Sequence, residues 1–453
     1  MRLIARFAQE QKNHFEIITV YDTEIIKELI EKENPEYISI AQEYPAALWF
    51  EQKIYDDFGI QVVDVATSNL LVKDDHFPQE FFPLRKEFSK LLVEHNDTQV
   101  KRKKKKKSKQ INLGPTHSYS LESSLFKLKD NGRKILDFSL IPSYKYRGIE
   151  KMVEGFTFQE AQPIIERISA PQTIAYQTAW LDIQLQASKK VLPDIIKKRH
   201  LFLLELERIN NHLHDLSILT KLVEFQEGAS FFLKFLESGR MAMKNLTGHR
   251  YGFNAVTLNA NDIELSEGYT FLLNLEKELH IFEKWMAKRE EILDKMHNLG
   301  KLSTEQIEAY GLVGTMARSA NVPLDRRKKD AFYEKHNFYL NLEEQSDVFS
   351  RFNLRISEIF TSLRIMRNLG KGTSFQFFLG KIRDGEYYSF VESSAGEVMM
   401  YLSLKEGVIH RFYLRDPSFL NAQILPLLLK DSKIENLGLT LKSIPLNISA
   451  IDL

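Results

Sequence analysis

Residues 192–224 read LPDIIKKRHLFLLELERINNHLHDLSILTKLVE, and this stretch decides the fold of the larger part of the chain. Its leucines and isoleucines recur every three to five residues, which places them along one face of a helix; they are Leu201, Leu204, Ile209, Leu213, Leu216 and Leu219. The opposite face carries Arg199, Glu207, Arg208 and Asp215. The spacing therefore predicts one long helix that packs its apolar face on a core.

Similar spacing predicts two further long helices, over 267–298 and 341–369, within a mainly helical region that runs from residue 113 to residue 453. Short strands rich in β-branched and aromatic residues are predicted around these helices; they span 125–128, 135–140, 387–391, 398–404 and 407–413. No internal repeat is visible in the sequence. The region is therefore expected to be a helical domain with small sheets.

Residues 1–95 form a smaller unit of mixed pattern. β-Branched and aromatic stretches at 15–21, 37–41, 47–50 and 61–65 predict strands, and residues 23–33 predict a helix. Such a mixture is typical of an α+β domain with an antiparallel sheet.

Residues 96–112 separate the two regions and contain almost no apolar side chain. Lys101 and Arg102 open a run with six further lysines that ends at Lys109. Like charges repel, and such a segment has nothing to bury, so we expect a flexible, solvated linker. Contact of 101–109 with anionic lipid or with nucleic acid is the alternative that this charge leaves open.

Composition limits the possible functions. Eight of the 62 Lys and Arg residues lie in the run 101–109. The rest of the chain therefore has fewer basic residues than its 61 Asp and Glu residues and is acidic, which argues against a nucleic-acid partner. The 453 residues include no cysteine, which excludes disulfides, thiolate nucleophiles and cysteine-held zinc, nickel or iron–sulfur sites. No apolar run has signal-peptide length or the ~20 residues of a membrane helix, so we expect a cytosolic-type chain.

Two short motifs carry polar groups beside glycines. Gly114-Pro115-Thr116-His117 predicts a turn that presents a histidine, which can act as a general acid; from the residues alone we favour an imidazole that caps nearby backbone. Tyr146–Lys151 (YRGIEK) groups an arginine, a carboxylate and a lysine. It predicts an exposed helix start with ordinary ion pairs, with a site that orients a partner's carboxylates as the alternative.

Two clusters of charged residues follow. Glu205, Arg208 and His212 share a face of the long helix, whereas His214 points elsewhere, so we predict a buried polar network and no helical histidine pair for a metal. The second cluster follows a glycine-containing turn and predicts an interdomain salt-bridge cluster or a bridge to a redox partner; it comprises Arg318, Asp325, Arg326 and Arg327. The sequence contains no phosphate-binding loop, dinucleotide fingerprint or serine-nucleophile elbow.

The order of the motifs resembles a known family. IYDDFGI (54–60) and FPLRKEF (82–88) resemble the 30-kDa-type subunit of respiratory complex I and the matching domain of membrane-bound (group 4) nickel–iron hydrogenases. Beyond the linker the chain resembles the 49-kDa-type subunit and the hydrogenase large subunit, fused as in formate-hydrogenlyase-type subunits. The matching segments are GPTH (114–117), YRGIEK (146–151), ERIS (166–169), AYQTAW (175–180), LELERINNHL (204–213), SGRMAMKNLTGHR (238–250), GLVGTMARSANVPLDRR (311–327), VESSAGEVMMYL (391–402) and IHRFYLRDPSFLNAQ (409–423).

The departures from this family concern the metal ligands. The hydrogenase pattern is R-I-C-G-x-C-S-x-x-H, and here Ser169 and Gln172 stand at the cysteine positions and Tyr176 at the histidine. A second cysteine pair would fall near the C-terminus, where this chain has Ser449–Leu453, and the arginine that overhangs the metal falls on Ala395. Hydroxyls cannot replace four thiolates around a soft nickel–iron centre, so we expect no metal on this chain.

The resemblance also implies site residues. Complex I binds quinone between a histidine, which His117 matches, and a tyrosine, whose position here is Ala170. Glu122 and Glu150 match acidic residues that would relay protons. Framework residues that would face an iron–sulfur cluster held by a partner subunit are matched by Arg147, Arg208 and His212.

Two classes of function follow from the resemblance. In the first, the chain is a peripheral, cytoplasmic-side subunit of a membrane-bound oxidoreductase complex, a scaffold or coupling element that packs against a 20-kDa-like iron–sulfur small subunit and membrane-arm subunits. In the second, it is an active NADH-quinone-oxidoreductase-type subunit that binds quinone in the former metal cavity. In both cases the iron–sulfur cluster belongs to the partner, and quinone is the one ligand this chain would bind itself.

Overall fold

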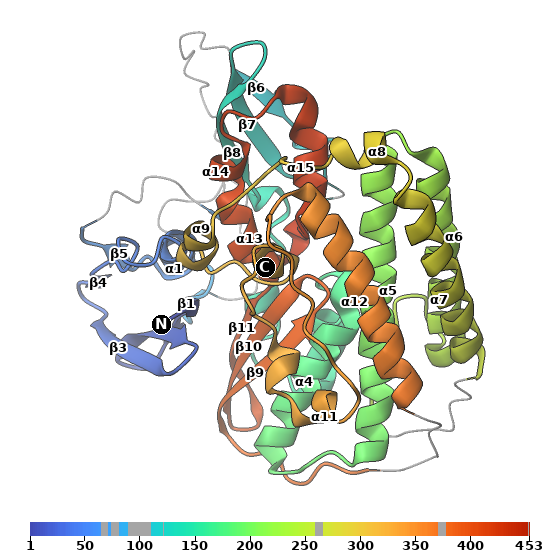
Figure 1. Ribbon diagram of the computed structural model, residues 1–453. Helices are drawn as coiled ribbons and strands as arrows, with labels where there is room; N and C mark the ends of the chain where they lie inside the picture. The colour runs from blue at the N-terminus through green and yellow to red at the C-terminus, as the bar shows by residue number, and fades with distance from the viewer. Residues whose placement is uncertain are drawn as a thin grey trace.

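The computed structural model describes residues 1–64, 71–73, 81–88, 110–120, 122–258, 266–369, 377–451 and 453. A small sheet-and-helix region at the amino terminus adjoins a larger region of long helices and two small sheets (Figure 1). The predicted fold class, an α+β domain followed by a mainly helical domain with small sheets, is confirmed. Of the predicted 96–112 linker, residues 110–112 belong to strand β6 (Gln110–Leu113), and residues 96–109 lie outside the described part of the chain.

The amino-terminal region is a three-stranded antiparallel sheet with a helix packed on it. The strands, in sheet order, are β1 (Leu3–Glu10), β2 (His14–Tyr21) and β3 (Ile25–Glu31). Helix α1 (Ala47–Phe58) packs on β1, and the two-residue strands β4 (Glu36–Tyr37) and β5 (Gln61–Val62) pair in parallel. The predicted antiparallel sheet is therefore confirmed.

The predicted helix over residues 23–33 was wrong, because these residues contain strand β3. The backbone of β3 pairs with β2 along its whole length, from Ile25 opposite Val20 to Glu31 opposite His14. Only Ile30 of β3 is buried. Sheet pairing therefore outweighs the helix propensity of the glutamates and lysines here, as tertiary context often does.

The predicted strand over residues 47–50 was also wrong, because these residues open helix α1. Phe50, Ile54 and Phe58 recur every four residues and are all buried, a helical period that a four-residue window cannot reveal. The strands predicted at 37–41 and 61–65 are shorter than expected, as β4 and β5.

Long helices dominate the larger region. They are α4 (Thr173–Ser188), α5 (Asp194–Leu222), α6 (Gln226–Thr247), α7 (Ser266–Met286) and α12 (Val348–Asn368). Shorter helices connect them: α2 (Ile149–Met152), α3 (Phe158–Ile165), α8 (Glu290–Asp294), α9 (Thr304–Ala309), α10 (Thr315–Arg318), α11 (Ala331–Glu334), α13 (Pro417–Asn421), α14 (Leu425–Leu429) and α15 (Leu437–Ser443). The predicted helix at 192–224 is confirmed as α5.

The other two predicted long helices differ in extent from the prediction. The stretch 267–298 is divided into α7 and α8. The stretch 341–369 becomes helical only at Val348, where the side chain of Asp347 accepts a hydrogen bond from the Ser350 N–H and caps α12.

The larger region also contains two three-stranded antiparallel sheets. One has the order β6-β7-β8, with β7 (Leu125–Asp130) and β8 (Ile135–Ile141). The other has the order β11-β10-β9, with β9 (Gly385–Ser393), β10 (Gly396–Lys405) and β11 (Val408–Arg415). All five predicted strands of this region are confirmed, and α4 packs against β9 and β10.

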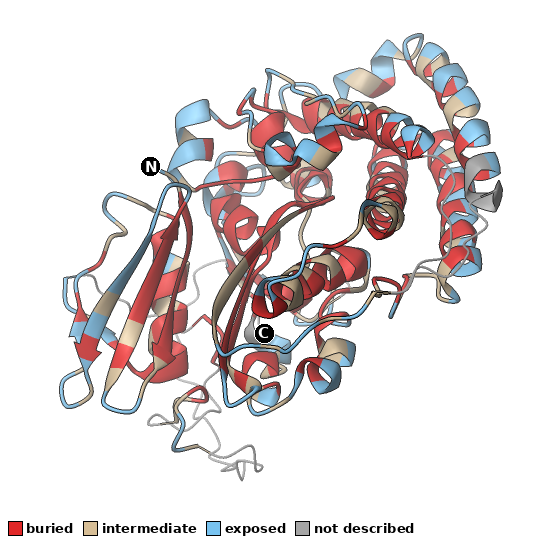
Figure 2. Cartoon of the chain, turned by 90° about the horizontal axis from the view of Figure 1, so that it is seen from below, coloured by how far each residue is buried: buried red, intermediate tan, exposed pale blue. Residues whose placement is uncertain are grey.

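Helix α5 lies inside the larger region, in contact with α4, α6 and α12. The helices at the centre of the molecule are buried over most of their length, whereas outer helices expose one face (Figure 2). Two residues of the charged face of α5 are buried as well: Glu207 and Arg208 are only 5% and 1% exposed. Polar groups at this depth need partners, which makes this helix the starting point for the search for a site.

The amino-terminal region and the larger region share one hydrophobic core. Phe7 of β1 stacks on Tyr413 of β11 with ring centroids 4.2 Å apart, and Phe50 of α1 stacks on Phe419 of α13 at 4.8 Å. Such ring pairs add to the stability that apolar burial supplies. The amino-terminal sheet is therefore fixed against the β9–β11 sheet.

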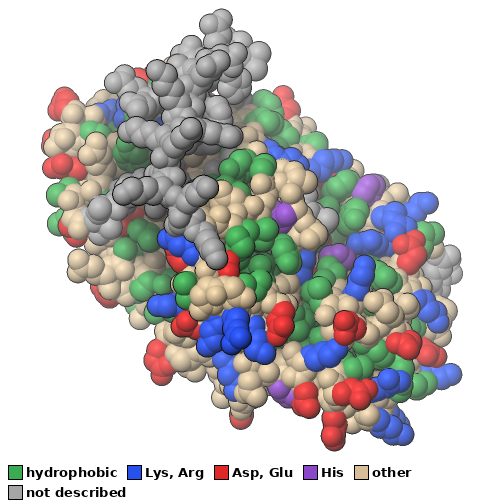
Figure 3. Space-filling model, turned by 90° about the horizontal axis from the view of Figure 1, so that it is seen from above, with side chains coloured by type: hydrophobic (Ala, Val, Ile, Leu, Met, Phe, Trp, Pro, Cys, Tyr) green, Lys and Arg blue, Asp and Glu red, His purple; other side chains and the backbone are tan. Residues whose placement is uncertain are grey.

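Two features of the described residues concern contact with membranes and nucleic acids: the apolar character of the helices and the distribution of surface charge. No helix in the part of the chain that the structure describes combines the length and the apolar character that crossing a membrane requires. On the face shown in Figure 3, basic and acidic side chains are interspersed among apolar ones. The described residues of this face therefore do not form a field of a single sign.

Candidate functional site

Arg147 connects the two segments in which the related hydrogenases carry their metal ligands. We call Ser169–Tyr176 and Ser449–Leu453 the former ligand segments. The Nη2 atom of Arg147 donates hydrogen bonds to the carbonyl oxygen of Ile168, at 2.9 Å, and to that of Ser449. One guanidinium thus joins the start of both segments, and charge-assisted bonds of this kind are among the stronger hydrogen bonds.

Tyr176, at the former histidine position, ties α4 to the segment after β11. It is fully buried, and its hydroxyl donates to Oδ2 of Asp416 at 2.7 Å. Asp416 in turn accepts the backbone N–H of Ser418 and caps α13. Burial raises the pKa of Tyr176 well above its ordinary value, so the phenol remains protonated and serves as a donor.

A carboxylate from α5 caps the start of α4. Glu207 accepts the backbone N–H groups of Ile174, at 2.6 Å, and of Ala175, at 3.2 Å. Gln172, at the second former cysteine position, precedes these residues and is 1% exposed. Burial raises the pKa of Glu207 to about 8, against the opposing effect of the two backbone hydrogen bonds. The first former ligand segment is therefore held by α5.

The loop around Ala395, where hydrogenases place their overhanging arginine, is packed against a glycine. Gly314 has φ +65°, and a Cβ there would lie only 1.9 Å from the Ala395 carbonyl oxygen. Asn211 donates from its amide to Oγ of Ser394, at 2.7 Å, and to the carbonyl of Pro171. The loop is thus held between α5 and the turn at Gly314. At the position of the hydrogenase arginine, Ala395 carries only a methyl group.

His117 is engaged through both ring nitrogens. Nδ1 accepts the Tyr119 N–H at 3.2 Å, so the proton lies on Nε2, which donates to the Ser124 carbonyl at 3.1 Å. The ring packs on Phe126 with centroids 4.4 Å apart, and burial lowers the pKa of His117. The predicted turn with an imidazole that caps backbone is confirmed.

Glu122 and Glu150, the other two predicted proton-handling residues, lie in different environments. Glu122 pairs with the exposed Lys145 at 2.6 Å. Glu150 is fully buried at the start of α2, where it pairs with Arg411 at 2.6 Å and with Lys53 of α1 at 3.4 Å. The interpretation of YRGIEK as an exposed helix start was therefore wrong: its carboxylate joins the two regions of the molecule, a contact that local sequence cannot reveal.

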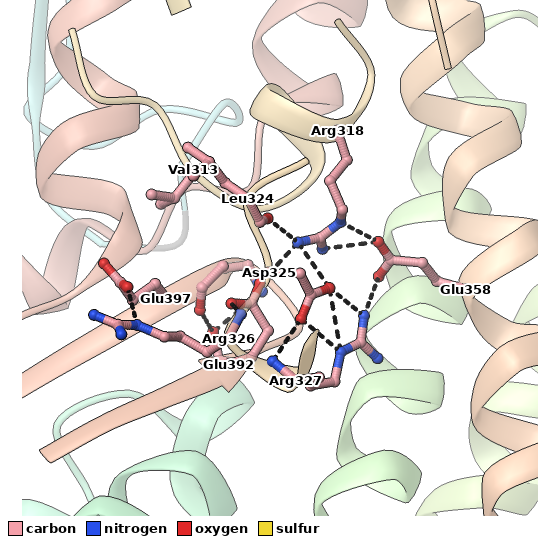
Figure 4. Close-up of polar contacts among 12 residues, drawn as sticks. Val313, Arg318, Leu324, Asp325, Arg326, Arg327, Glu358, Glu392 and Glu397 are labelled. Carbon is pink, nitrogen blue, oxygen red and sulfur yellow. Dashed lines mark hydrogen bonds and ion pairs between the residues drawn. The ribbon is translucent and has the colours of Figure 1, made fainter. Parts of the chain in front are cut away.

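The polar network predicted on α5 is present, and it extends beyond this helix to the contacts around Arg318, which Figure 4 shows. Its charged members are fully or almost fully buried; they are Glu205, Arg208, His212, Arg318, Asp325, Arg327, Glu358 and Glu392, which we call the buried charge network. On α5, Arg208 pairs with Glu205 at 3.2 Å. His212 contacts Glu358 of α12 at 2.9 Å.

Arg318 is the centre of this network. Its guanidinium pairs with Glu358 at 2.7 Å, with Glu392 at 2.8 Å and with Asp325 at 3.2 Å (Figure 4). Asp325 also pairs with Arg327 at 2.7 Å. These arginines lie inside the larger region, so the interpretation of this cluster as a bridge to a redox partner was wrong for Arg318 and Arg327.

The remaining arginine of that predicted cluster, Arg326, also pairs within the larger region. Its side chain binds Glu397 of β10, and Glu397 in turn binds Arg2 of the amino-terminal region at 3.0 Å. The interdomain salt-bridge interpretation was therefore wrong for the described ion pairs of Arg318, Arg326 and Arg327, which all lie within the larger region.

The network also holds the loop that leads to Ala395. Arg208 donates from Nη2 to the carbonyl of Glu392 and from Nη1 to that of Ser393, both at 2.7 Å. Burial opposes ionisation of Glu358, but Arg318 and His212 lower its pKa well below the ordinary range. Burial raises the pKa of Glu392 to about 7. The pKa values of two carboxyl groups bound by the same arginine are therefore shifted in opposite directions.

Comparisons with known proteins match both regions of the chain. Residues 3–91 match the family described as respiratory-chain NADH dehydrogenase, 30 Kd subunit, and residues 242–375 match the corresponding 49 Kd subunit family. The chain is 24% identical to the fused C/D subunit of NADH-quinone oxidoreductase from Hydrogenobaculum sp. over 511 residues, which cover 98% of this chain and 89% of that protein. The chain is a fused 30-kDa/49-kDa-type subunit of the complex I family.

Further relatives of this complex I-type chain include hydrogenase-related proteins. Formate hydrogenlyase subunit 5 of Escherichia coli is 25% identical over 352 residues, which cover 74% of this chain and 62% of that protein. A chain of the membrane-bound sulfane sulfur reductase, an archaeal respiratory membrane complex, shares the fold with a TM-score of 0.69 at 18% identity, over 76% of this chain and 98% of that one.

Among the described residues, no group of three or more His, Cys, Asp or Glu side chains is arranged to hold a metal ion, and the sequence has no cysteine. None of the described contacts joins His117 to Arg147 or Glu150. The roles of His117, Glu122 and Glu150 in proton handling stay predictions.

Sequence reasoning missed several residues that complete these sites. Glu358 and Glu392 balance the arginines, Lys53 pairs with Glu150, and Asp416 binds Tyr176. These partners are distant in sequence: Asp416 lies 240 residues from Tyr176, and Glu358 and Glu392 lie 40 and 74 residues from Arg318. The available signal was the position of Glu358 between Ile356 and Ile359 and of Glu392 next to Val391, because a charge among apolar neighbours needs a partner.

Proposed function

We propose that this chain is a peripheral, cytoplasmic-side subunit of a membrane-bound respiratory complex related to complex I and the group 4 hydrogenases. It acts there as a scaffold or coupling subunit and has no nickel–iron centre. Three similarities support the proposal: the end-to-end match to fused C/D subunits, the match to formate hydrogenlyase subunit 5, and the fold shared with a subunit of an archaeal respiratory membrane complex.

The observation that carries the proposal is the bond pattern of Arg147. Its guanidinium binds the carbonyl groups of Ile168 and Ser449, where a hydrogenase would bring its two ligand segments to the metal. In this chain the segments are held by an arginine and by the Tyr176–Asp416 bond. Protein hydrogen bonds thus supply the cross-links that metal ligands supply in those relatives.

The partners follow from the same relationship. An iron–sulfur small subunit of the 20-kDa type would pack beside the former ligand segments and hold the cluster, since this chain has no cysteine for one. Membrane-arm subunits would anchor the assembly. Arg208 and His212 are both buried, so neither would contact a partner's cluster, and Arg208 would act on it through its charge.

An active quinone-binding subunit is the competing function, with His117 as the proton donor and Glu122 and Glu150 as relays. Three observations weigh against it. Both nitrogens of His117 are used within the β6–β7 connection, and Glu150 is paired with Arg411 and Lys53. The tyrosine of the quinone site is Ala170 here.

Purification of the native assembly through a tag on this chain tests the proposal. We expect an iron–sulfur subunit and membrane subunits to co-purify, with iron but no nickel. Arg147→Ala should reduce recovery of the iron–sulfur subunit, whereas Arg250→Ala, which removes an exposed arginine paired with Glu237, should not. Recovery of the chain alone, or with stoichiometric nickel, contradicts the proposal.

The variant His117→Ala separates the two functions in the same preparation. A scaffold retains quinone-linked electron transfer in the intact complex. A loss of about 100-fold or more, the usual contribution of a positioned acid, establishes the quinone-binding function instead. His280→Ala, at an exposed histidine of α7, is the matched control.

A further inference from the structure

The buried charge network contains an unequal number of charges. Its cations are the guanidinium groups of Arg208, Arg318 and Arg327, and its carboxylates are Glu205, Asp325, Glu358 and Glu392. With every carboxylate ionised and His212 neutral, the network carries a net charge of −1. An uncompensated charge at this depth is costly, and binding one proton removes it.

The neighbours of the network do not supply the missing positive charge. On the α12 side His212 faces Arg355, but Arg355 is itself paired with Asp215 at 3.1 Å. Glu392 faces Arg318, Arg327, Arg208 and the acidic Asp325. Arg326 reaches Glu392 only through its backbone N–H, at 3.1 Å, because its side chain binds Glu397.

We propose that the buried charge network stores one exchangeable proton, held mainly by Glu392, with the His212–Glu358 pair as a second position. The step is an acid–base one: a proton from water forms an O–H bond on the Glu392 carboxylate, and no electron is transferred. Arg318 contacts both Glu392 and Glu358, so it is the electrostatic link between the two positions.

Three features favour Glu392 as the main holder. It makes one ion pair, whereas Glu358 is bound by Arg318, His212 and, at 4.0 Å, Arg327. Among the four carboxylate side chains it is the only one with any exposure, 2%, which gives exchange with solvent a starting point. Burial also raises its pKa to about 7, which places exchange near neutral pH.

The stored proton would change the charge at the base of the Ser393–Ala395 loop. Arg208 binds the carbonyls of Glu392 and Ser393, so the loop and the network move as one unit. In the respiratory assembly proposed above, a proton taken up here can compensate an electron on a partner's cluster. This coupling role rests on the proposed function, whereas the proton store itself does not.

Proton-binding titration of the full-length chain tests the inference. As the pH is lowered across 7, wild type should bind one proton more than Glu392→Gln, and infrared spectra should show a protonated-carboxyl band that this variant lacks. Glu160→Gln is the control, because backbone and side-chain hydrogen bonds from Thr157 lower the pKa of that exposed carboxyl. Equal proton uptake by wild type and Glu392→Gln overturns the proposal.

Glu205→Gln provides a second and independent test. Glu205 is ionised, because Arg208 and Arg327 lower its pKa in spite of burial. Removing its charge makes the network neutral with Glu392 ionised, so uptake of the proton should disappear although Glu392 is intact. Retention of the full uptake in Glu205→Gln overturns the charge-balance argument. These titrations use the chain without partners, so their outcome does not depend on whether the assembly forms.

Discussion

Arg2 and Glu397 are 395 residues apart in sequence, and Nη2 of Arg2 donates to both carboxylate oxygens of Glu397 at 3.0 Å. Arg415 pairs with the same carboxylate at 2.6 Å, and Arg326 binds it as well. Burial alone would raise the pKa of Glu397, but these three guanidinium groups hold it at about 2. The Glu397 carboxylate of β10 thus binds Arg2 of the amino-terminal region as well as Arg326 and Arg415 of the larger region.

Glu397→Gln should therefore destabilise the whole chain. The substitution leaves three arginines without their shared partner, and breaking a buried ion pair from one side costs about 3–5 kcal/mol. Urea unfolding of the full chain measures this loss. Arg2→Ala should cost less, about 1.5–3 kcal/mol, because Arg326 and Arg415 remain. Equal unfolding midpoints for wild type and Glu397→Gln would contradict the role of this carboxylate.

The pH dependence of stability tests the same site with a defined sign. Because the pKa of Glu397 is lowered from 4.5 to about 2, its contribution is present above pH 4.5 and is lost as the pH falls toward 2. Wild type should therefore lose stability over this interval more steeply than Glu397→Gln. Parallel losses in the two proteins would show that other carboxylates dominate acid unfolding.

Glu150 and Glu122 should respond very differently to the same substitution. Glu150→Gln leaves Lys53 and Arg411 with less compensation inside the protein and should cost about 3–5 kcal/mol. Glu122→Gln removes an exposed pair with Lys145 and should cost less than about 1 kcal/mol. Thermal or urea unfolding distinguishes the two variants. Similar small losses of stability in both would show that the ion pairs of Glu150 do not hold the two regions together.

A buried polar network could be predicted on α5 because three of its members lie on this one helix. Glu205, Arg208 and His212 are three and four residues apart, so helical geometry alone brings them together. Glu358 and Glu392 come from α12 and β9, and only tertiary packing places them beside Arg318. Charge spacing within one element is readable from sequence, whereas charge balance between elements is not.

The amino-terminal region shows the same limit for secondary structure. The β-branched and aromatic stretch that predicts β2 covers residues 15–21, but residues 47–50 are too few to separate a period of two from a period of 3.6. Residues 23–33 contain good helix formers and still form β3, because pairing with β2 decides their backbone conformation. Substitution of the former ligands was readable from sequence, but the bonds of Arg147 that join those segments were not.

Glu207 should make the chain less stable at higher pH. Burial raises its pKa from 4.5 to about 8, so its contribution is present below pH 4.5 and is lost as the pH rises through 8. Glu207→Gln should flatten this loss, since the amide does not ionise, while its oxygen still accepts one N–H at the start of α4. Urea unfolding midpoints between about pH 5 and pH 8 measure the slope, because in this interval the unfolded chain has lost the proton that the folded chain retains. An unchanged slope in Glu207→Gln would contradict the raised pKa.

Tyr176→Phe tests whether the former histidine position now has a structural role. The substitution removes the hydroxyl that donates to Asp416 at 2.7 Å and leaves that buried carboxyl with fewer donors, at a cost of about 1–3 kcal/mol. Burial raises the pKa of Asp416 against the hydrogen bonds from Ser418 and Tyr176, so loss of the Tyr176 bond should raise this pKa further. Urea unfolding gives the loss in stability.

The control for this position is Tyr387→Phe, because Tyr387 is a partly exposed tyrosine whose hydroxyl donates to the Arg383 carbonyl at 2.9 Å. Water can replace that donor, so this variant should lose less than about 1 kcal/mol. The double variant Tyr176→Phe with Asp416→Asn isolates the pair: if the hydroxyl stabilises the chain through Asp416, the two losses are not additive. Additive losses would show that Tyr176 and Asp416 act separately, and that α4 is held in place by other contacts.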